Sequence, residues 1–521
     1  MAAVARHFPV SHSDRNVAAT VDKQEPIPSD AVFPKRNSAP SPHSTLTATD
    51  DDDAETVDGQ SPSPLASLTP DTSTAKLPPT SPATALLPQP IETTQGLPPP
   101  EEMGWYEVSR GIFLGFFLVI NSVLVNFTQF LFWPVHLASP SAFRSWTQHT
   151  ERYFSVVLLY LTQWLAPTQL VITREAGFPA FVKHRGEPPI PSDPASPVVL
   201  DGCNVEFDLG PEAAAAIVIA NHQVYMDWIY LWFVAYYAGY HGAIKIILKA
   251  SLRKVPIFGW AMQFYRFIFL QRQWAQDRRS FLDQIASMRA DNTPQSGSHP
   301  YWITLFPEGT TISSYSIPIT RKFAEAEKLP IPDHVLIPRA TGLYHIVHAL
   351  RGQATYVYDL TLGCEGLSLG QIPQDTFTIP RMYLGGRQYP RRVHVHFRRV
   401  ALADIPEDAD AFTEWLRTRW TEKDELMRYF YTHGHFPNHF PSTAHGARGE
   451  EKEEEGKEVG LFRSMAPATE SEQINTGGGA TTAINRPDAV VQVRVRSVWE
   501  LGQLWFTAIL VLTFLRWFVL V

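Results

Sequence analysis

The chain has 521 residues, which is enough for two or three domains. Its formal net charge of −8 and its isoelectric point near 6.1 argue against a nucleic-acid-binding protein. It contains two cysteines, Cys203 and Cys364, so neither a disulfide framework nor a cysteine-based zinc site is expected. Prolines and aromatic residues are concentrated in different parts of the chain, which predicts polar tails around an aromatic, membrane-associated centre.

Residues 1–103 are rich in Pro, Ser, Thr and Ala, contain an acidic run from Asp50 to Asp53, and have almost no aromatic residues. This composition predicts a disordered tail. A transit peptide within about the first 20 residues is the less favoured alternative. Asp14 interrupts the basic pattern there, and the segment has no clear amphipathic stripe.

Two apolar stretches follow within residues 104–170, where we expect membrane-embedded helices. Residues 111–133 carry no formal charge and are long enough to cross a bilayer. The amide side chains in this stretch are costly in lipid, which favours a partner helix or an interfacial, re-entrant position. They are Asn121, Asn126 and Gln129. Residues 154–166 end before Pro167, are too short to span reliably, and predict an interfacial helix.

Residues 171–435 are expected to form an α/β domain, because short apolar runs alternate with helical patterns. Such alternation predicts a mostly parallel sheet flanked by helices. Residues 183–212 are richer in Pro and Gly and predict an inserted surface loop. The expected strands are 170–173, 213–220, 244–248, 267–270, 303–306, 335–337, 355–360 and 393–397. The expected helices include 228–237, 275–290, 320–328 and 411–431.

The C-terminal part of the chain divides into a polar and an apolar stretch. Residues 436–495 are polar and glycine-rich, with an acidic run that Lys452 interrupts, and predict a disordered, solvated linker. Residues 496–521 predict a C-terminal transmembrane helix, because the run from 501 onward is apolar except for Arg516.

Residues 221–227, Asn-His-Gln-Val-Tyr-Met-Asp, interrupt the apolar pattern between an expected strand and an expected helix. Functional side chains often occupy such junctions in α/β proteins. Five residues along a helix turn through roughly 140°, so His222 and Asp227 cannot share one helical face. We therefore expect His222 in the turn and Asp227 on the helix, where its carboxylate would fix the imidazole tautomer and leave a basic nitrogen. With 18 histidines in the chain, one such pair is expected by chance, so the pair needs further support.

A cationic stretch follows. Arg272 comes directly after an apolar strand-like run, and its guanidinium suits a phosphate group. Other cations precede it along the chain. A solvated or membrane-surface basic patch is the alternative interpretation for Arg272 and for these cations. These are Lys245, Lys249, Arg253 and Lys254.

Two further motifs also follow apolar runs. In Phe-Pro-Glu-Gly-Thr at residues 306–310, Gly309 permits a backbone turn and Glu308 stands at the carboxyl end of the sheet. Glu308 could bind a polyol hydroxyl there; the alternative is a solvated turn glutamate. Arg339 follows Pro338 at the end of the third run, which alone is equally consistent with a structural strand end.

Together and in this order, the four stretches resemble the glycerolipid acyltransferase family, which contains the 1-acylglycerol-3-phosphate and lysophospholipid acyltransferases. The resemblance covers roughly residues 215–345 and, more loosely, 105–435. The run from Lys249 to Arg272, and the sequence Asn-His-Gln around His222, look most like the lysocardiolipin acyltransferase branch. The glycine that the family usually places before Phe-Ile in the second block is absent.

This resemblance implies transfer of an acyl chain from acyl-CoA, as co-substrate, to the free hydroxyl of a lysophospholipid. His222 would be the general base and Asp227 would orient and support it. The substrate-binding residues that it implies are Arg272, Glu308, Gly309, Thr310 and Arg339. No metal and no bound cofactor are implied.

Several alternatives remain open at this stage. The acceptor could be lysophosphatidic acid, lysophosphatidylinositol or lysocardiolipin, because all three carry a phosphate near the hydroxyl. An integral membrane protein of the endoplasmic reticulum is expected, with a mitochondrial membrane second. A catalytically silent lipid-binding protein on the same fold is disfavoured because both His222 and Asp227 are present. A metallohydrolase is disfavoured because no third ligand stands at a recognisable spacing.

Overall fold

The computed structural model describes residues 104–186, 198–293, 299–367, 370–383, 388–437 and 487–520. The polar tail expected at residues 1–103 lies outside the described residues, as does most of the linker expected at residues 436–495. Part of the loop expected at residues 183–212 also lies outside them.

Short strands and helices alternate through most of the described chain, as the apolar pattern predicts. The strands are β1 (Gln169–Arg174), β2 (Val182–His184), β3 (Val199–Asp201), β4 (Val205–Phe207), β5 (Ala215–Ala220), β6 (Ile244–Lys249), β7 (Ile268–Leu270), β8 (Tyr301–Leu305), β9 (Tyr356–Cys364), β10 (Arg392–Ala401) and β11 (Ala489–Gln492). The helices are α1 (Trp105–Phe132), α2 (Val135–Ala138), α3 (Pro140–Leu165), α4 (Asp227–Tyr237), α5 (Phe258–Phe264), α6 (Trp274–Asp291), α7 (Ser316–Glu327), α8 (Ala340–Leu350), α9 (Pro373–Thr376), α10 (Ile379–Tyr383), α11 (Ala409–His433) and α12 (Trp499–Leu520).

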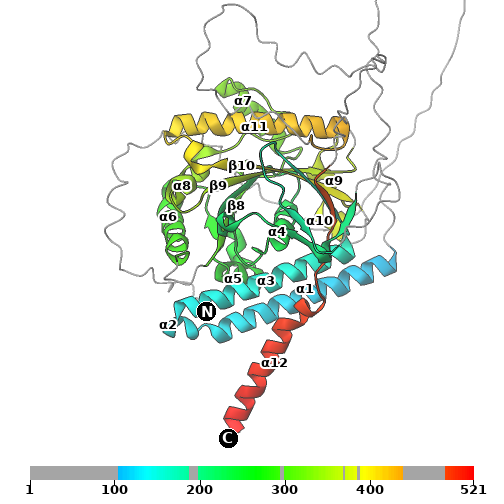
Figure 1. Ribbon diagram of the computed structural model, residues 1–521, viewed down its shortest axis with the longest axis vertical. Coiled ribbons are helices and arrows are strands. Elements are labelled where there is room, and N and C mark those ends of the chain that lie inside the picture. The colour runs from blue at the N-terminus through cyan, green and yellow to red at the C-terminus, as the bar shows by residue number, and fades with distance from the viewer. Residues whose placement is uncertain are drawn as a thin grey trace, which may run out of the picture. The chain divides into compact units, whose positions relative to one another are not determined.

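A nine-stranded sheet forms the centre of this arrangement (Figure 1). Its strand order is β3-β11-β1-β10-β9-β5-β8-β6-β7. The pairs β9–β10 and β1–β11 run antiparallel, and the other neighbouring strands run parallel. The expected α/β architecture with a mostly parallel sheet is therefore confirmed. A separate two-stranded sheet pairs β2 with β4.

Helices cover both faces of the sheet (Figure 1). Along β5, Ala216 and Val218 belong to an apolar cluster that also contains residues of α3 and α4. The alternating residues Ile217 and Ile219 belong to a second cluster, which includes residues of α6, α8 and α11. Both faces of β5 are buried, so this strand is apolar throughout instead of alternating with polar residues.

Two expectations are wrong near the sheet. Residues 335–337 form no strand, because the backbone N–H of Val335 donates to the Asp424 carboxylate of α11 at 3.2 Å and not to a neighbouring strand. The surface loop expected at residues 183–212 contains β3, which extends the main sheet, and β4, which pairs with β2. Strands of three residues are too short for a periodic pattern to reveal them.

The end of the expected linker also belongs to the sheet. β11 lies within residues 436–495 and pairs with β1 on one side and β3 on the other. Val490 and Val491 are buried in this position. The linker interpretation is therefore wrong for β11, because this short apolar run finds its partners far away in the sequence.

Among the described residues, one helix is long and apolar enough to cross a membrane. It is α1, over Val108–Phe132. All three of its amide side chains, Asn121 included, bond to other elements, as the cost of burying them in lipid predicts. Asn126 Nδ2 donates to the Ile257 carbonyl at 3.0 Å, and Gln129 Nε2 donates to Thr150 Oγ1 of α3 at 3.0 Å.

The second apolar stretch is part of the longer helix α3, which packs against both α1 and α4. In its middle, Glu151 accepts a hydrogen bond from Lys245 of β6 at 2.7 Å, and both side chains are buried. Most side chains of residues 154–166 are buried in the protein core. The interfacial position expected for this stretch stays a prediction.

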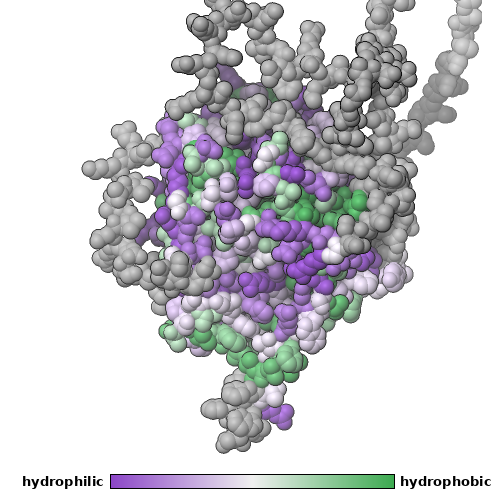
Figure 2. Space-filling view, in the orientation of Figure 1, coloured by the Kyte–Doolittle hydropathy of each residue, from purple (hydrophilic) through white to green (hydrophobic). Residues whose placement is uncertain are grey.

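Helix α12 confirms a helical conformation for most of residues 496–521, and it packs against α1 and α3. Trp505 Nε1 donates to Asn121 Oδ1 of α1 at 3.0 Å. Apolar surface gathers around these helices at the lower edge of the view in Figure 2, below a predominantly hydrophilic surface. Among the described side chains of α12, the exposed apolar ones are Trp499, Trp505, Phe506, Ile509, Leu510 and Leu512.

Candidate active site

The carboxyl ends of adjacent parallel strands place the candidate site at one edge of the sheet. β5 and β8 are neighbours, with Ile219 opposite Leu305 near the ends of the two strands. The loops that begin at Asn221 and Phe306 therefore leave the sheet side by side. β7 ends at the same edge of the sheet, because it is parallel to β6 and β6 is parallel to β8. This is the edge where parallel α/β sheets bind ligands.

His222 lies in the loop after β5, and Asp227 is the first residue of α4, as expected. The two side chains meet, with His222 Nδ1 3.0 Å from Asp227 Oδ2. The same carboxylate oxygen accepts a hydrogen bond from the backbone N–H of Val224 at 2.9 Å. Asp227 is completely buried, whereas 16% of the His222 side chain is exposed.

These contacts define which ring nitrogen of His222 can act as a base. A carboxylate accepts hydrogen bonds, so the Nδ1 atom facing Asp227 carries the proton of the neutral ring. Nε2 then has the lone pair that can accept a proton from a substrate. Burial raises the pKa of Asp227, while the hydrogen bond from His222 lowers it.

The loop after β8 contacts His222 at two points. The ring of Phe306 stacks on the His222 imidazole, with centroids 4.1 Å apart and an angle of 18° between the planes. Further along the loop, the backbone N–H of Ile312 donates to the carbonyl of His222 at 2.9 Å. The Phe-Pro-Glu-Gly-Thr segment is therefore in direct contact with the His-Asp pair.

Two arginines meet at the glycine of this segment. Arg272 Nη2 donates to the Gly309 carbonyl at 3.1 Å. The backbone N–H of Arg339 donates to the Pro307 carbonyl at 2.8 Å, which brings the Arg339 side chain beside Gly309. Both residues have solvent-exposed surface. Partial burial of the guanidinium lowers the pKa of Arg339, and the charge of Arg272 lowers it further. Two adjacent guanidinium groups form a suitable site for a phosphate.

Two residues in this cationic part have left-handed backbone conformations. Gly309 has φ of +74°, which glycine adopts without a steric penalty. Arg272 has φ of +66°, which is unfavourable for a residue with a Cβ atom. Such strain is commonly found at functional sites, where it aims a side chain that the surrounding structure holds.

Comparison with known proteins identifies the family. Residues 204–364 match the family model described as acyltransferase, and residues 383–460 match the model described as acyltransferase C-terminus. An uncharacterized acyltransferase of Schizosaccharomyces pombe is 31% identical over 321 residues, which are 61% of this chain and 84% of the relative. The chain belongs to the glycerolipid acyltransferase family.

Relatives with more specific names are also similar to this acyltransferase. The 2-acyl-1-lysophosphatidylinositol acyltransferase of Saccharomyces cerevisiae is 31% identical over 325 residues, covering 57% of this chain and 77% of the relative. Lysocardiolipin acyltransferase 1 of Danio rerio is 35% identical over 221 residues, covering 42% of this chain and 52% of the relative. The residues that match the acyltransferase model include both His222 and Phe306.

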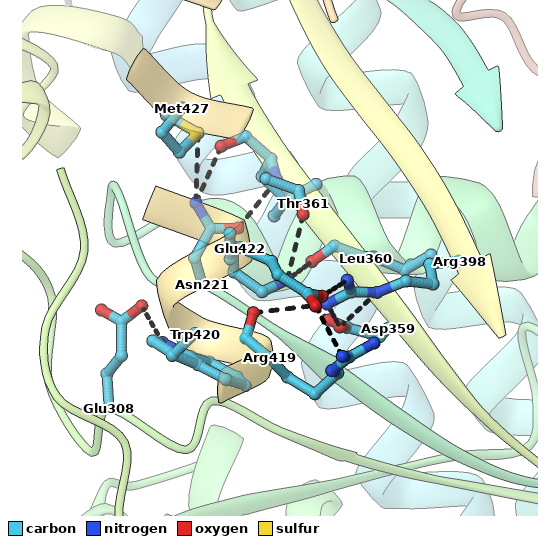
Figure 3. Close-up of polar contacts among 12 residues, drawn as sticks. Asn221, Glu308, Asp359, Leu360, Thr361, Arg398, Arg419, Trp420, Glu422 and Met427 are labelled. Atoms are coloured by element: carbon cyan, nitrogen blue, oxygen red, sulfur yellow. Dashed lines mark hydrogen bonds and ion pairs between the residues drawn. The ribbon is translucent and has the colours of Figure 1, made fainter. Parts of the chain in front are cut away.

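Most of the site residues predicted from the sequence lie close together in this acyltransferase. Glu308 is the exception, because its side chain is not directed toward the other site residues. Glu308 is buried, and its Oε1 accepts a hydrogen bond from Trp420 Nε1 of α11 at 3.2 Å (Figure 3). The carboxylate is thus directed toward α11, whereas Gly309 and the exposed Thr310 lie at the surface of the loop. Lys245 also lies apart from the arginines, because it is paired with Glu151.

Several residues of the acyltransferase site could not be predicted from the sequence. Phe306 stood inside a recognised motif, yet nothing in the sequence predicted its stack on His222. Trp420 lies on a predicted amphipathic helix, where an aromatic residue indicates core packing. Among the described residues, no group of three or more His, Cys, Asp or Glu side chains is arranged to hold a metal ion.

Proposed function

We propose that this acyltransferase transfers a fatty acyl chain from acyl-CoA to the free hydroxyl of a lysophospholipid. The observation that carries the proposal is the contact between His222 and Asp227, which leaves Nε2 as the basic nitrogen. Arg272 and Arg339 lie beside Gly309. Gly309 belongs to the same loop as Phe306, whose ring stacks on His222. A base and a phosphate-binding group in one loop region suit an acceptor that carries a hydroxyl close to a phosphate.

In this mechanism Nε2 of His222 removes the proton of the acceptor hydroxyl as its oxygen attacks the thioester carbonyl carbon. A new C–O bond forms, and the C–S bond then breaks. The coenzyme A thiolate leaves and receives the proton from the imidazolium. Asp227 stabilises the imidazolium through Nδ1, and its complete burial strengthens this electrostatic interaction.

The acceptor class follows from the cationic part of the site. Lysophosphatidic acid, lysophosphatidylinositol and lysocardiolipin all place a phosphate next to a glycerol hydroxyl. The printed names of similar proteins include acyltransferases for lysophosphatidylinositol, acylglycerol phosphate and lysocardiolipin. We propose that Arg272 and Arg339 bind the phosphate that these three acceptors share.

The test offers labelled acyl-CoA and a panel of lysophospholipids to membranes that carry the full chain. Matched membranes carry His222→Ala at equal abundance. His348→Ala serves as a control, because His348 lies on α8 and contacts the carbonyl of Glu407 instead of the His222 loop. We expect transfer by the wild type and the control and none by His222→Ala. Absence of transfer to every acceptor by the wild type, or full transfer by His222→Ala, would overturn the mechanism.

We also propose that α1 and α12 attach the enzyme to a membrane. α1 is apolar, and Phe113 and Phe116 on it are 67% and 64% exposed. α1 packs along α3, whose buried Glu151 pairs with the sheet domain, so an interfacial position suits α1 better than a separate span. Lipid substrates would then reach the site from the same membrane.

Membrane fractionation tests this attachment. Phe113→Glu combined with Phe116→Glu should weaken membrane retention during an alkaline carbonate wash. The matched control introduces glutamate at Thr418 and Thr421, which are exposed on α11. Equal retention of both double variants would contradict a membrane role for this face of α1. Co-fractionation with endoplasmic reticulum or mitochondrial markers would decide the compartment, for which we propose the endoplasmic reticulum.

A further inference from the structure

We propose that helix α11 is a positioning element of the active site, in which one face of the helix holds the two loops that carry His222 and Glu308. This inference rests on the proposed acyl transfer. α11 lies outside residues 204–364, which match the acyltransferase model, and inside residues 383–460, which match the C-terminal model. The C-terminal segment would therefore complete the catalytic site instead of only covering the sheet.

The first contact is between Trp420 and Glu308. Both side chains are buried, and the indole N–H donates to the carboxyl group at 3.2 Å (Figure 3). Glu308 lies between Phe306, which stacks on His222, and Gly309, which accepts from Arg272. A bond that holds Glu308 therefore limits the movement of the loop on both sides.

The second contact reaches the residue before the histidine. The Asn221 side chain forms two hydrogen bonds with the backbone of Leu362 in β9, at 2.9 and 2.8 Å. Met427 of α11 closes this arrangement, with its sulfur 3.7 Å from Asn221 Nδ2 (Figure 3). The start of the catalytic loop is thus held between the sheet and α11.

The third contact reaches the residue after the histidine. Asp424 of α11 accepts hydrogen bonds from three consecutive backbone N–H groups, those of residues 333–335, at 2.7 to 3.2 Å. The carbonyl of His334 in that segment accepts from Gln223 Nε2 at 2.9 Å. Tyr431 of α11 also donates to Gln223 Oε1 at 3.3 Å. Gln223 is therefore held by α11 both directly and through this segment.

These contacts come from one face of the helix. Trp420, Asp424, Met427 and Tyr431 follow one another at spacings of four, three and four residues, which place them along one side of α11. Lys423 secures the helix to the sheet, because its completely buried ammonium group binds Asp359 at 2.6 Å and the carbonyl of the next strand residue at 2.7 Å. The face is therefore fixed in position relative to β9.

The test uses the full chain and two substitutions that each remove one hydrogen-bonding group. Trp420→Phe removes the indole N–H, and Asp424→Asn replaces one carboxylate oxygen with a group that cannot accept from the backbone. Glu414→Gln is the matched control, because Glu414 is exposed on the same helix and its near neighbour is Arg417 at 4.0 Å. Initial rates give kcat and KM for the preferred lysophospholipid, and hydrogen exchange reports on residues 221–226, 306–312 and 333–335.

We expect each variant at the α11 face to lose about tenfold in kcat with little change in KM, because misaligned groups slow the chemical step. Exchange should accelerate in the loops and stay unchanged in β5 and β9. Wild-type kcat in both variants would overturn the proposal, and so would faster exchange throughout the chain, which indicates general destabilisation. If the wild type transfers no acyl chain, the proposed function fails, and exchange confined to the loops still decides whether α11 holds them.

Discussion

The imidazole of His222 lies flat on the ring of Phe306, with ring centroids 4.1 Å apart. This stack joins two motifs that are far apart in the sequence. Together with the bond from Nδ1 to Asp227, it restricts the orientation of the ring, so Nε2 has a defined direction toward a substrate.

Replacing Phe306 tests the contribution of the stack. Phe306→Leu retains an apolar side chain but loses the flat surface, so the imidazole gains rotational freedom. We expect kcat to fall about tenfold with KM for the acceptor nearly unchanged, because orientation affects the chemical step. Phe306→Tyr keeps the ring and should retain most of the activity. Equal kcat for Phe306→Leu and the wild type would show that the stack has no role in orientation.

Asp227→Asn preserves the shape of the side chain and one acceptor oxygen for the Val224 N–H. The amide cannot neutralise an imidazolium, and its NH₂ group favours the wrong tautomer of His222. By analogy with other His-Asp pairs, kcat should fall by about 10³-fold or more. Steady-state rates beside Asp283→Asn, an exposed substitution on α6, provide the measurement and its control. A loss below about tenfold would contradict the role assigned to Asp227.

Arg272→Asn removes the guanidinium while asparagine still tolerates the left-handed backbone at φ of +66°. Charge-assisted hydrogen bonds to phosphate contribute about 1.5–3 kcal/mol, so KM for the lysophospholipid should rise by about tenfold to a hundredfold. The KM for acyl-CoA is the internal comparison. Arg279→Asn, at an exposed position of α6, should leave both values unchanged. Unchanged KM in Arg272→Asn would remove this arginine from the phosphate site.

The burial of Glu308 predicts a pH-dependent stability. Burial raises the pKa of this carboxyl to about 8, and the hydrogen bond from Trp420 offsets the effect only in part. The folded state therefore holds a proton that the unfolded chain releases above its ordinary pKa, near 4.3. The resulting stability is complete below that ordinary pKa and is lost as the pH rises through about 8.

Thermal unfolding of the solubilised protein between pH 5 and pH 9 tests the direction of this pH dependence. The range covers most of the interval between the pKa of Glu308 in the unfolded chain and its pKa in the folded protein. Glu308→Gln carries no titrating group at this position, so its melting temperature should gain on the wild type as the pH increases. Other buried groups titrate equally in both proteins and cancel in the difference. A constant difference across the range would contradict the raised pKa of Glu308.

The buried ion pairs beneath α11 predict a large stability effect. Arg398 binds both Asp359 and Glu422, and all three are buried (Figure 3). Arg398→Met would leave two buried carboxylates without this partner and should destabilise the fold by about 3–5 kcal/mol. Denaturant or thermal unfolding measures the loss, and Arg391→Met at an exposed position is the control. Stability equal to that of the control would contradict a structural role for the network.

The local order of the chain was enough to predict the alternating strands and helices and the meeting of His222 with Asp227. Both depend on nearby residues: the apolar periodicity of each segment, and the geometry of a five-residue spacing at a strand-to-helix turn. The motif Phe-Pro-Glu-Gly-Thr was recognisable for the same reason. Its residues are contiguous, and the preceding apolar run places them at the carboxyl edge of a parallel sheet.

Contacts between distant segments were decided only by the tertiary structure. β11 becomes a strand because β1 and β3 offer it hydrogen-bonding partners, and Val335 becomes part of a loop because Asp424 captures its N–H group. Glu308 faces Trp420 because α11 packs over the sheet at that point. Such pairings depend on which surfaces meet after folding, and no pattern within either segment contains that information.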